Sequence, residues 1–203
     1  MKRINNYINE RLNLNKGSKF DSYQYHPKTR DELEKLIKQL IKERGNEADL
    51  NDIDTSKITN MSYLFYDSNF NGDISEWDVS NVEIMVGTFN RAGFNGDISN
   101  WDVSKVTTMK NMFYQSQFNK DISKWDVSNV KMMWGMFYNS EFNQDISNWD
   151  VSNVENMYAM FCSSKFNQDI SGWNVKNNVN YGDMFNNSPL EKNPPKWYNE
   201  KDN

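Results

Sequence analysis

Residues 97–120 read D-I-S-N-W-D-V-S-K-V-T-T-M-K-N-M-F-Y-Q-S-Q-F-N-K, and this pattern returns along most of the chain with a period of 24 residues. Aromatic residues mark the period: tryptophan occupies positions 77, 101, 125, 149 and 173, and phenylalanine occupies positions 70, 94, 118, 142 and 166. Counted from the first aspartate, the six units are 49–72, 73–96, 97–120, 121–144, 145–168 and 169–192. A fixed period of about 20 to 50 residues predicts a solenoid, because one unit cannot bury its apolar face alone.

The apolar pattern changes in the middle of each unit. Trp101 and Val103 alternate with polar residues, which favours a short strand with one apolar face. Val106, Met109 and Phe113 then follow at helical spacing, which favours a short helix facing the same core. We therefore predict an α/β repeat solenoid of six 24-residue units, each built as strand, turn and short helix.

The segments on either side of the repeat are expected to close its ends, since terminal units otherwise expose apolar edges. An amphipathic helix is predicted over 29–44, beginning at a Thr29/Glu32 capping box and ending at Gly45. The predicted division is a helical N-terminal cap or leader at 1–48, the repeat at 49–192, and a C-terminal cap and tail at 193–203.

The string FNxDISxWDVSNVxxMxxMF, repeated with variations over 49–192, resembles the BspA-like short leucine-rich repeats of bacterial surface proteins, a family also found among mycoplasma lipoproteins of unknown function. This resemblance implies a leucine-rich-repeat-like, parallel-stranded fold that binds other proteins and performs no catalysis. Residues 1–16 resemble the leaders of repeat proteins encoded by tailed phages, which implies a phage-encoded member of the family.

Composition excludes several functional classes. With 23 basic and 28 acidic side chains the formal charge is −5, which does not suit a protein that neutralises nucleic-acid phosphates. Cys162 and His26 are single residues of their types, so we expect no internal disulfide, no zinc site and no other metal or cofactor. Recognised catalytic motifs are missing, and the chain is therefore not expected to be an enzyme.

The first 15 residues contain no uninterrupted apolar run, so no signal peptide is predicted. No stretch approaches the roughly 18 consecutive apolar residues of a membrane-spanning helix. A cytoplasmic or virion-associated location is the expectation. The alternative is the cell surface, reached by an unconventional route.

A column of aspartates, one from each predicted strand, is expected to face outward: Asp54, Asp78, Asp102, Asp126 and Asp150. Neighbouring strands lie about 4.8 Å apart, a spacing at which two carboxylates repel by roughly 1 kcal/mol in water. One hypothesis is that a basic protein surface, or less readily cations, lies along this concave face. The other is that each carboxylate accepts local hydrogen bonds and keeps the units in register.

Departures from the repeat point to a second surface. Trp134 and Tyr158 occupy a position that holds Val86 or Lys110 in other units. Tyr114 and Tyr138 directly follow a core phenylalanine, and with Tyr66 these residues are predicted to form an outward aromatic strip. Aromatic side chains often anchor protein interfaces. A chance cluster on an aromatic-rich chain is the alternative.

These features predict a non-enzymatic protein-binding or scaffolding repeat module. We expect it to be a structural component of a larger assembly such as a phage virion, present in multiple copies. The alternative is a bacterial surface adhesin of the leucine-rich-repeat type.

Overall fold

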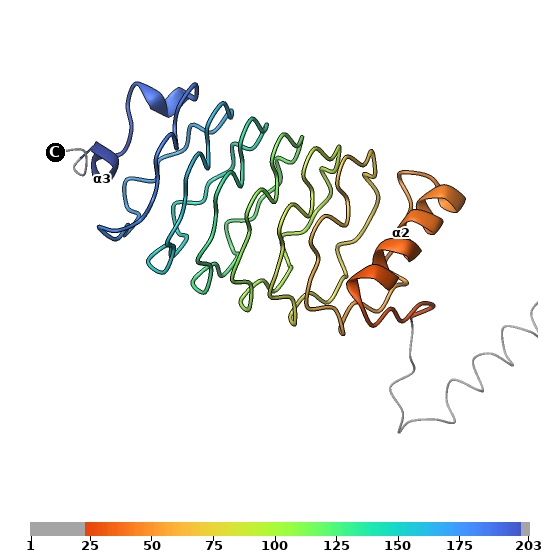
Figure 1. Cartoon of the computed structure of the whole chain (residues 1–203). Helices are drawn as coiled ribbons and strands as arrows, with labels where there is room; N and C mark the ends of the chain where they lie inside the picture. Colours follow the sequence, from red (N-terminus) through yellow and green to blue (C-terminus); the bar gives the residue numbers. More distant parts are fainter. Residues whose placement is uncertain (1–22, 200–203) are drawn as a thin grey trace, which may run out of the picture.

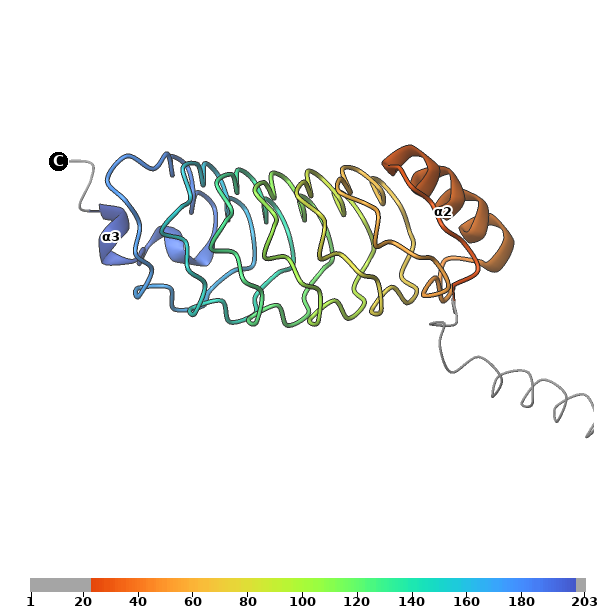
Figure 2. The ribbon, with the colours of Figure 1, turned by 90° about the horizontal axis from the view of Figure 1, so that it is seen from below.

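The computed structural model describes residues 23–199. This part of the chain contains the α-helix α2 (Arg30–Arg44), the 3-10 helix η1 (Pro189–Glu191) and the short α-helix α3 (Lys196–Asn199). Between α2 and η1 the chain runs in successive coils that stack side by side, with α2 at one end of the stack and α3 at the other (Figure 1). The view turned by 90° shows the same order (Figure 2).

The 24-residue period is confirmed as the repeat of the stack. Isolated parallel bridges join equivalent residues of successive coils, and each bridged pair in this series is separated by 24 positions: Asn60, Ile84, Thr108, Met132, Asn156 and Asn180. We call each 24-residue unit a coil and each set of equivalent positions a column. No β-strand forms in residues 23–199, where the repeat is held by these single bridges and by other hydrogen bonds between coils.

The predicted α/β solenoid of strand, turn and short helix is therefore wrong. Where a strand was expected, the Trp101 N–H donates to the Ile98 carbonyl (3.2 Å) and the Val106 N–H donates to the Val103 carbonyl (2.9 Å). Such bonds between residues three apart close tight turns. The two tight turns direct the apolar side chains inward, so these side chains are buried without the alternation of a β-strand.

The predicted short helix over 106–113 is also absent. Asn111 and Gln115 have positive φ angles of 54° and 53°, a left-handed conformation that cannot continue a right-handed helix. The Met109 N–H donates to the Met132 carbonyl (2.8 Å), and the Asn111 N–H donates to the Trp134 carbonyl (2.9 Å). These amides bond to the next coil, so they are not available for a helix within their own coil.

Phenylalanine side chains stack inside the coils along the length of the molecule. Phe113 lies against Phe118 of its own coil, with 4.3 Å between ring centroids, and against Phe137 of the next coil at 5.5 Å. The planes of both pairs are nearly parallel, at 14° and 4°. Aromatic pairs in such arrangements contribute roughly 0.5–1.5 kcal/mol beyond the area they bury.

Helix α2 confirms the helix predicted before the repeat. The Thr29 side chain accepts a hydrogen bond from the Glu32 N–H (3.3 Å), and Gly45 ends the helix with φ of 90°. The capping box is not reciprocal, because the Glu32 carboxylate accepts from the Lys28 N–H (2.7 Å). Arg30 Nε donates to the Ser62 carbonyl (2.9 Å), and this bond fixes α2 against the first coil.

The opposite end is closed by α3. Trp197 stacks on Trp173 with 6.2 Å between centroids, and its Nε1 donates to the Ile170 carbonyl (2.9 Å). Tyr198 meets the Phe185 ring edge-on at 4.9 Å. The leader expected at residues 1–16 lies outside the described part of the chain. In the part described, no helix is both long and apolar enough to cross a membrane.

Candidate functional site: an aromatic face

The predicted aspartate column occupies tight turns. Asp78, Asp102, Asp126 and Asp150 are exposed and Asp54 is half-buried. Each Oδ1 accepts the N–H of the serine two residues later, over 3.0–3.1 Å, in the pairs Asp54–Ser56, Asp78–Ser80, Asp102–Ser104, Asp126–Ser128 and Asp150–Ser152. Side-chain turns of this kind stabilise local backbone conformation. This geometry supports the hypothesis that the column has an architectural role.

These hydrogen bonds also lower the pKa values of Asp102 and Asp150 in this column. The Ser104 side chain, followed by the Ser104 backbone amide, holds the pKa of Asp102 below its usual value. The Ser152 side chain and amide lower the pKa of Asp150 in the same way. Hydrogen bonding to the ionised form offsets part of the repulsion between neighbouring carboxylates.

A second aspartate column repeats the same turn. Asp73, Asp97, Asp121, Asp145 and Asp169 accept the N–H groups of Ser75, Ser99, Ser123, Ser147 and Ser171 over 2.8–2.9 Å. In each of these five carboxyls the backbone amide of that serine is the largest cause of a lowered pKa. Both aspartate columns therefore stabilise the tight turns of the coils.

The aromatic strip is displayed on one face of the stack. Tyr63, which was not predicted, joins it there. The large hydrophobic side chains left exposed in residues 23–199 are Tyr66 (49%), Tyr63 (42%), Trp134 (37%) and Tyr158 (36%). Tyr114 and Tyr138 are half-buried, and their rings stack at 4.7 Å with 5° between the planes. We call these six residues the aromatic face.

The backbone of each coil explains why these side chains point outward. Met109, Met112 and Phe113 are fully buried, whereas Lys110 and Tyr114, between and beside them, are partly exposed. The left-handed residues of this segment reverse the direction of the chain locally, and their N–H groups bond to the next coil. One coil therefore presents three partly exposed positions here, Lys110, Asn111 and Tyr114, and stacking converts them into three columns.

Two glycines make room on this face. Gly135 has φ of 59°, and a Cβ at this position would lie 2.4 Å from Asn111 Oδ1. Gly87 has the same φ, and a Cβ there would lie 2.3 Å from the Tyr63 ring. Because glycine accepts this conformation without strain, the preceding coil's side chain can lie across it.

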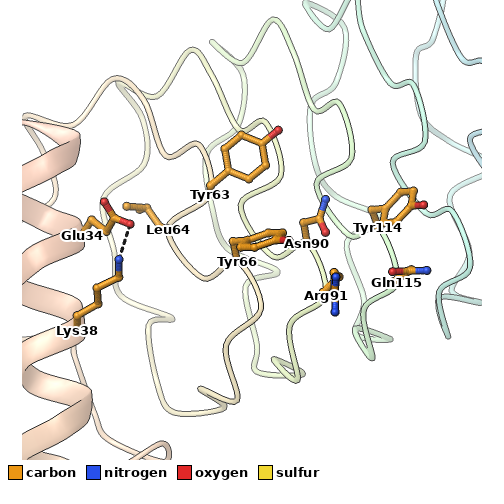
Figure 3. Close-up of a pocket in the computed structure, with 9 residues that line it drawn as sticks. All are labelled: Glu34, Lys38, Tyr63, Leu64, Tyr66, Asn90, Arg91, Tyr114 and Gln115. Atoms are coloured by element: carbon orange, nitrogen blue, oxygen red, sulfur yellow. Dashed lines mark hydrogen bonds and ion pairs between the residues drawn. The ribbon is translucent and has the colours of Figure 1, made fainter.

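Two depressions lie on the aromatic face and share Tyr114. The first has a volume of about 650 Å³ and lies between α2 and the first coils; Figure 3 shows Glu34 and Lys38 on one side and Tyr114 and Gln115 on the other. The second, of about 490 Å³, is lined by Tyr114, Trp134, Tyr138, Tyr158, Cys162 and Asp183. Together they make a hollowed surface that runs across several coils.

Charged groups are paired at the first depression. Glu34 contacts both Lys38 (2.8 Å) and Arg30 (2.7 Å). The hydrogen bond from Lys38 is the largest cause of the lowered pKa of Glu34. Arg91 Nε lies 3.3 Å from Asp67 Oδ1. These pairs leave little uncompensated charge at this end of the aromatic face.

The charged groups at the second depression contact aromatic side chains. Lys110 Nζ lies 3.9 Å from the centroid of the Trp134 ring, in a cation–π contact. The Tyr158 hydroxyl donates to Asp183 Oδ2, and this bond is the largest cause of the raised pKa of Tyr158. Asn186 Nδ2 donates to Asp183 Oδ1 (2.8 Å). The depression thus combines open ring surface with an oriented carboxylate.

The structure brings together four of the predicted site residues, Tyr114, Trp134, Tyr138 and Tyr158, and separates them from the aspartate column, which does not line the depression. Tyr63 and Asp183 were missed by sequence reasoning. Each departs from its column, which elsewhere holds Gly87, Asn111, Gly135 and Ala159, and that departure was the available signal. Within the described residues no group of three or more His, Cys, Asp or Glu side chains could hold a metal ion.

The fold and this face define a repeat protein made of stacked 24-residue coils. The chain matches, over residues 32–140 and again over 94–198, the family described as "Mycoplasma protein of unknown function, DUF285". Since these matches cover more than half of the sequence, the chain belongs to this family. No curated protein matches the chain, and neither does any solved structure.

Proposed function

We propose that this chain is a non-enzymatic repeat module that binds a protein through its aromatic face and serves as a structural component of a larger assembly. The main support comes from the four large hydrophobic side chains that are exposed in the described residues: Tyr63, Tyr66, Trp134 and Tyr158. All four line the two adjoining depressions of one face. Exposed aromatic clusters of this kind mark interaction surfaces, and tryptophan and tyrosine are enriched among the residues that dominate binding energy.

The framework beneath the face favours binding. The backbone at Met109 and Asn111 is fixed by bonds to the next coil, and the phenylalanines below are fully buried. A partner that meets such a surface has few side chains to order. Binding to a preorganised surface loses less conformational entropy.

The carboxylates support a non-catalytic role. Acid–base catalysis by two carboxyls needs environments that push their pKa values apart. Asp102 and Asp150 each accept a hydrogen bond from the serine two residues later, and in each case the side chain of that serine is the largest cause of the lowered pKa, followed by its backbone amide. Repetition of one environment does not create an acid and a base.

The binding proposal is tested in the native source by chemical crosslinking followed by mass spectrometry. The Trp134→Ala/Tyr158→Ala variant is expected to lose at least about 90% of the partner crosslinks, since truncating central aromatic anchors costs about 2 kcal/mol or more. The matched control is Asp102→Asn/Asp126→Asn, which alters two exposed side chains outside the depressions and should retain them. Undiminished crosslinking of the aromatic variant would overturn the proposal.

The assembly proposal is tested by sedimentation of native material, with the protein quantified across the fractions. Recovery at fixed stoichiometry with a megadalton particle supports a structural component of a virion or similar assembly. Recovery as a free small protein contradicts the assembly role, and recovery with cell envelopes favours a surface adhesin instead.

A further inference from the structure

One column on the aromatic face ends in a partly exposed ring. Lys110, Trp134, Tyr158 and Gly182 occupy equivalent positions in four successive coils. The Lys110 ammonium lies over the Trp134 ring (3.9 Å to the centroid), and the Trp134 and Tyr158 rings are 6.5 Å apart with a tilt of 58°. Gly182 has no side chain to cover Tyr158 in the way that Lys110 covers Trp134.

Gly182 preserves the opening beside Tyr158. A Cβ at Gly182 would lie 3.3 Å from Tyr158 Cδ2, so a larger residue would press on the ring. The exposed fraction of Tyr158 is 36%. The ring therefore keeps surface that a ligand can contact.

A carboxylate that forms no ion pair with the described part of the chain lies beside this ring. Asp183 receives hydrogen bonds from the Tyr158 hydroxyl and from Asn186 Nδ2, which fix its orientation. No lysine, arginine or histidine forms an ion pair with Asp183 within residues 23–199. Each carboxylate oxygen can accept more than one hydrogen bond, so Asp183 has acceptor capacity left.

The charge of the surroundings favours a cation. No basic residue lines the second depression, and the neighbouring Lys110 ammonium is held over the Trp134 ring. Of the 23 basic and 28 acidic residues, 11 and 7 lie in positions 1–48, which leaves 12 and 21, or a net −9, in positions 49–203. An approaching cation is attracted by this field as well as by Asp183.

We propose that the protein partner inserts a lysine or arginine side chain into the second depression, with its cationic group against the Tyr158 ring and the Asp183 carboxylate. This inference rests on the proposed protein-binding function and names the chemistry of the partner. Cations bind aromatic faces by attraction to the ring quadrupole, and a carboxylate adds a charge-assisted hydrogen bond. The Lys110–Trp134 contact is the same recognition made within the chain.

Stacking of sugar rings fits this depression less well. A sugar needs the open face of an aromatic ring, but Tyr114 and Tyr138 each cover one face of the other at 4.7 Å. One face of Trp134 is already covered by Lys110. A cation, in contrast, needs only the uncovered ring surface of Tyr158 and the adjoining carboxylate.

The test is isothermal titration of the full chain with three peptides of equal length, which contain lysine, acetyl-lysine or glutamate at the same positions. The lysine peptide is expected to bind and the other two are not, because acetylation removes the charge and glutamate reverses it. Asp183→Asn should weaken binding of the lysine peptide about tenfold, as expected for loss of a charge-assisted contact. Tyr158→Phe, which keeps the ring and removes the hydroxyl that orients Asp183, should weaken it less.

The matched control is Asp150→Asn, which removes one negative charge from the coil that carries Tyr158 but lies outside the depression. It should change the affinity by less than about twofold, the effect of a screened distant charge. Equal weakening by Asp150→Asn and Asp183→Asn would show diffuse attraction and overturn the inference. No peptide binding, together with loss of partner crosslinks in the Trp134→Ala/Tyr158→Ala variant, would overturn the inference but retain the proposed function. Crosslinks that survive in that variant would reject the proposed function itself.

Discussion

The indole Nε1–H of Trp125 donates a hydrogen bond to the main-chain carbonyl of Ile98, one coil earlier, over 3.1 Å. Because Trp125 is only 3% exposed, this bond satisfies a polar group that has no access to water. The same bond recurs along the column in the pairs Trp77–Leu50, Trp101–Ile74, Trp149–Ile122, Trp173–Ile146 and Trp197–Ile170. The tryptophans therefore fill the core and also tie each coil to the previous one.

Trp125→Phe is expected to lower the free energy of unfolding by about 1–3 kcal/mol, because the Ile98 carbonyl loses one of its two donors and keeps only the Trp101 N–H, and because the smaller ring leaves a cavity. The control is Trp134→Phe, at an exposed position, which should change stability by less than about 0.5 kcal/mol. Urea unfolding followed by circular dichroism measures both values. Equal stability of the two variants would contradict the structural role of the indole bond.

Gly135→Ala should destabilise the fold by about 1–2 kcal/mol. The left-handed conformation is unfavourable for alanine, and the alanine Cβ would clash with Asn111 Oδ1. Gly172→Ala is the matched control, because no atom lies within 4 Å of its added Cβ and its φ is not positive. Its effect should be near zero or slightly stabilising. Thermal unfolding of the two variants decides between a backbone requirement at Gly135 and a general preference for glycine.

Asparagine side chains form another connection between coils. Asn119 Oδ1 accepts the Asn143 N–H (2.9 Å), while the Asn119 N–H donates to Asn95 Oδ1 (2.9 Å). Asn119→Ala is expected to cost about 1–2 kcal/mol because the Asn143 amide loses its acceptor. Asn100→Ala, at an exposed side chain of the same coil with no hydrogen bond among the described residues, should be neutral in the same urea titration. A neutral Asn119→Ala would show that water replaces the amide.

Acid should lower the free energy of unfolding, because the aspartates in the tight turns of the coils become protonated. The Ser99 and Ser123 backbone amides lower the pKa values of Asp97 and Asp121 in the folded chain, whereas the unfolded value is about 3.9. Between the two values the unfolded chain binds more protons, so the free energy of unfolding rises with pH in this window. This contribution is complete above about pH 4–5 and is lost as the pH falls through the folded pKa values.

The pH prediction is measured from urea midpoints at pH 6 and pH 3. The Asp97→Asn/Asp121→Asn variant should lose less stability on acidification than the unmodified chain, because it lacks two of the carboxyls that titrate in this range. An identical loss in both proteins would place the acid sensitivity elsewhere.

The sequence predicted the parts of the molecule that depend on which side chains are apolar. The 24-residue period, the inward tryptophan and phenylalanine columns and the helix before the repeat could all be read from spacing, because burial requires apolar side chains at regular intervals. Trp134 and Tyr158 could be predicted as exposed because they replace other residue types at a variable position. The expected strand and helix were wrong because a spacing of three residues also suits a tight turn, and side-chain periodicity does not identify the partner of a backbone amide.

The sequence by itself determined the repeat, its core and its variable positions, since these follow from side-chain chemistry at fixed spacing. The tertiary structure alone decided the backbone path, because the Met109 amide finds its acceptor at Met132, in the next coil. Stacking also decided the candidate site. It brings Tyr158 to Asp183, 25 positions later, and joins both to Trp134 at one depression. No local pattern specifies such a contact, because it exists only once successive coils lie against one another.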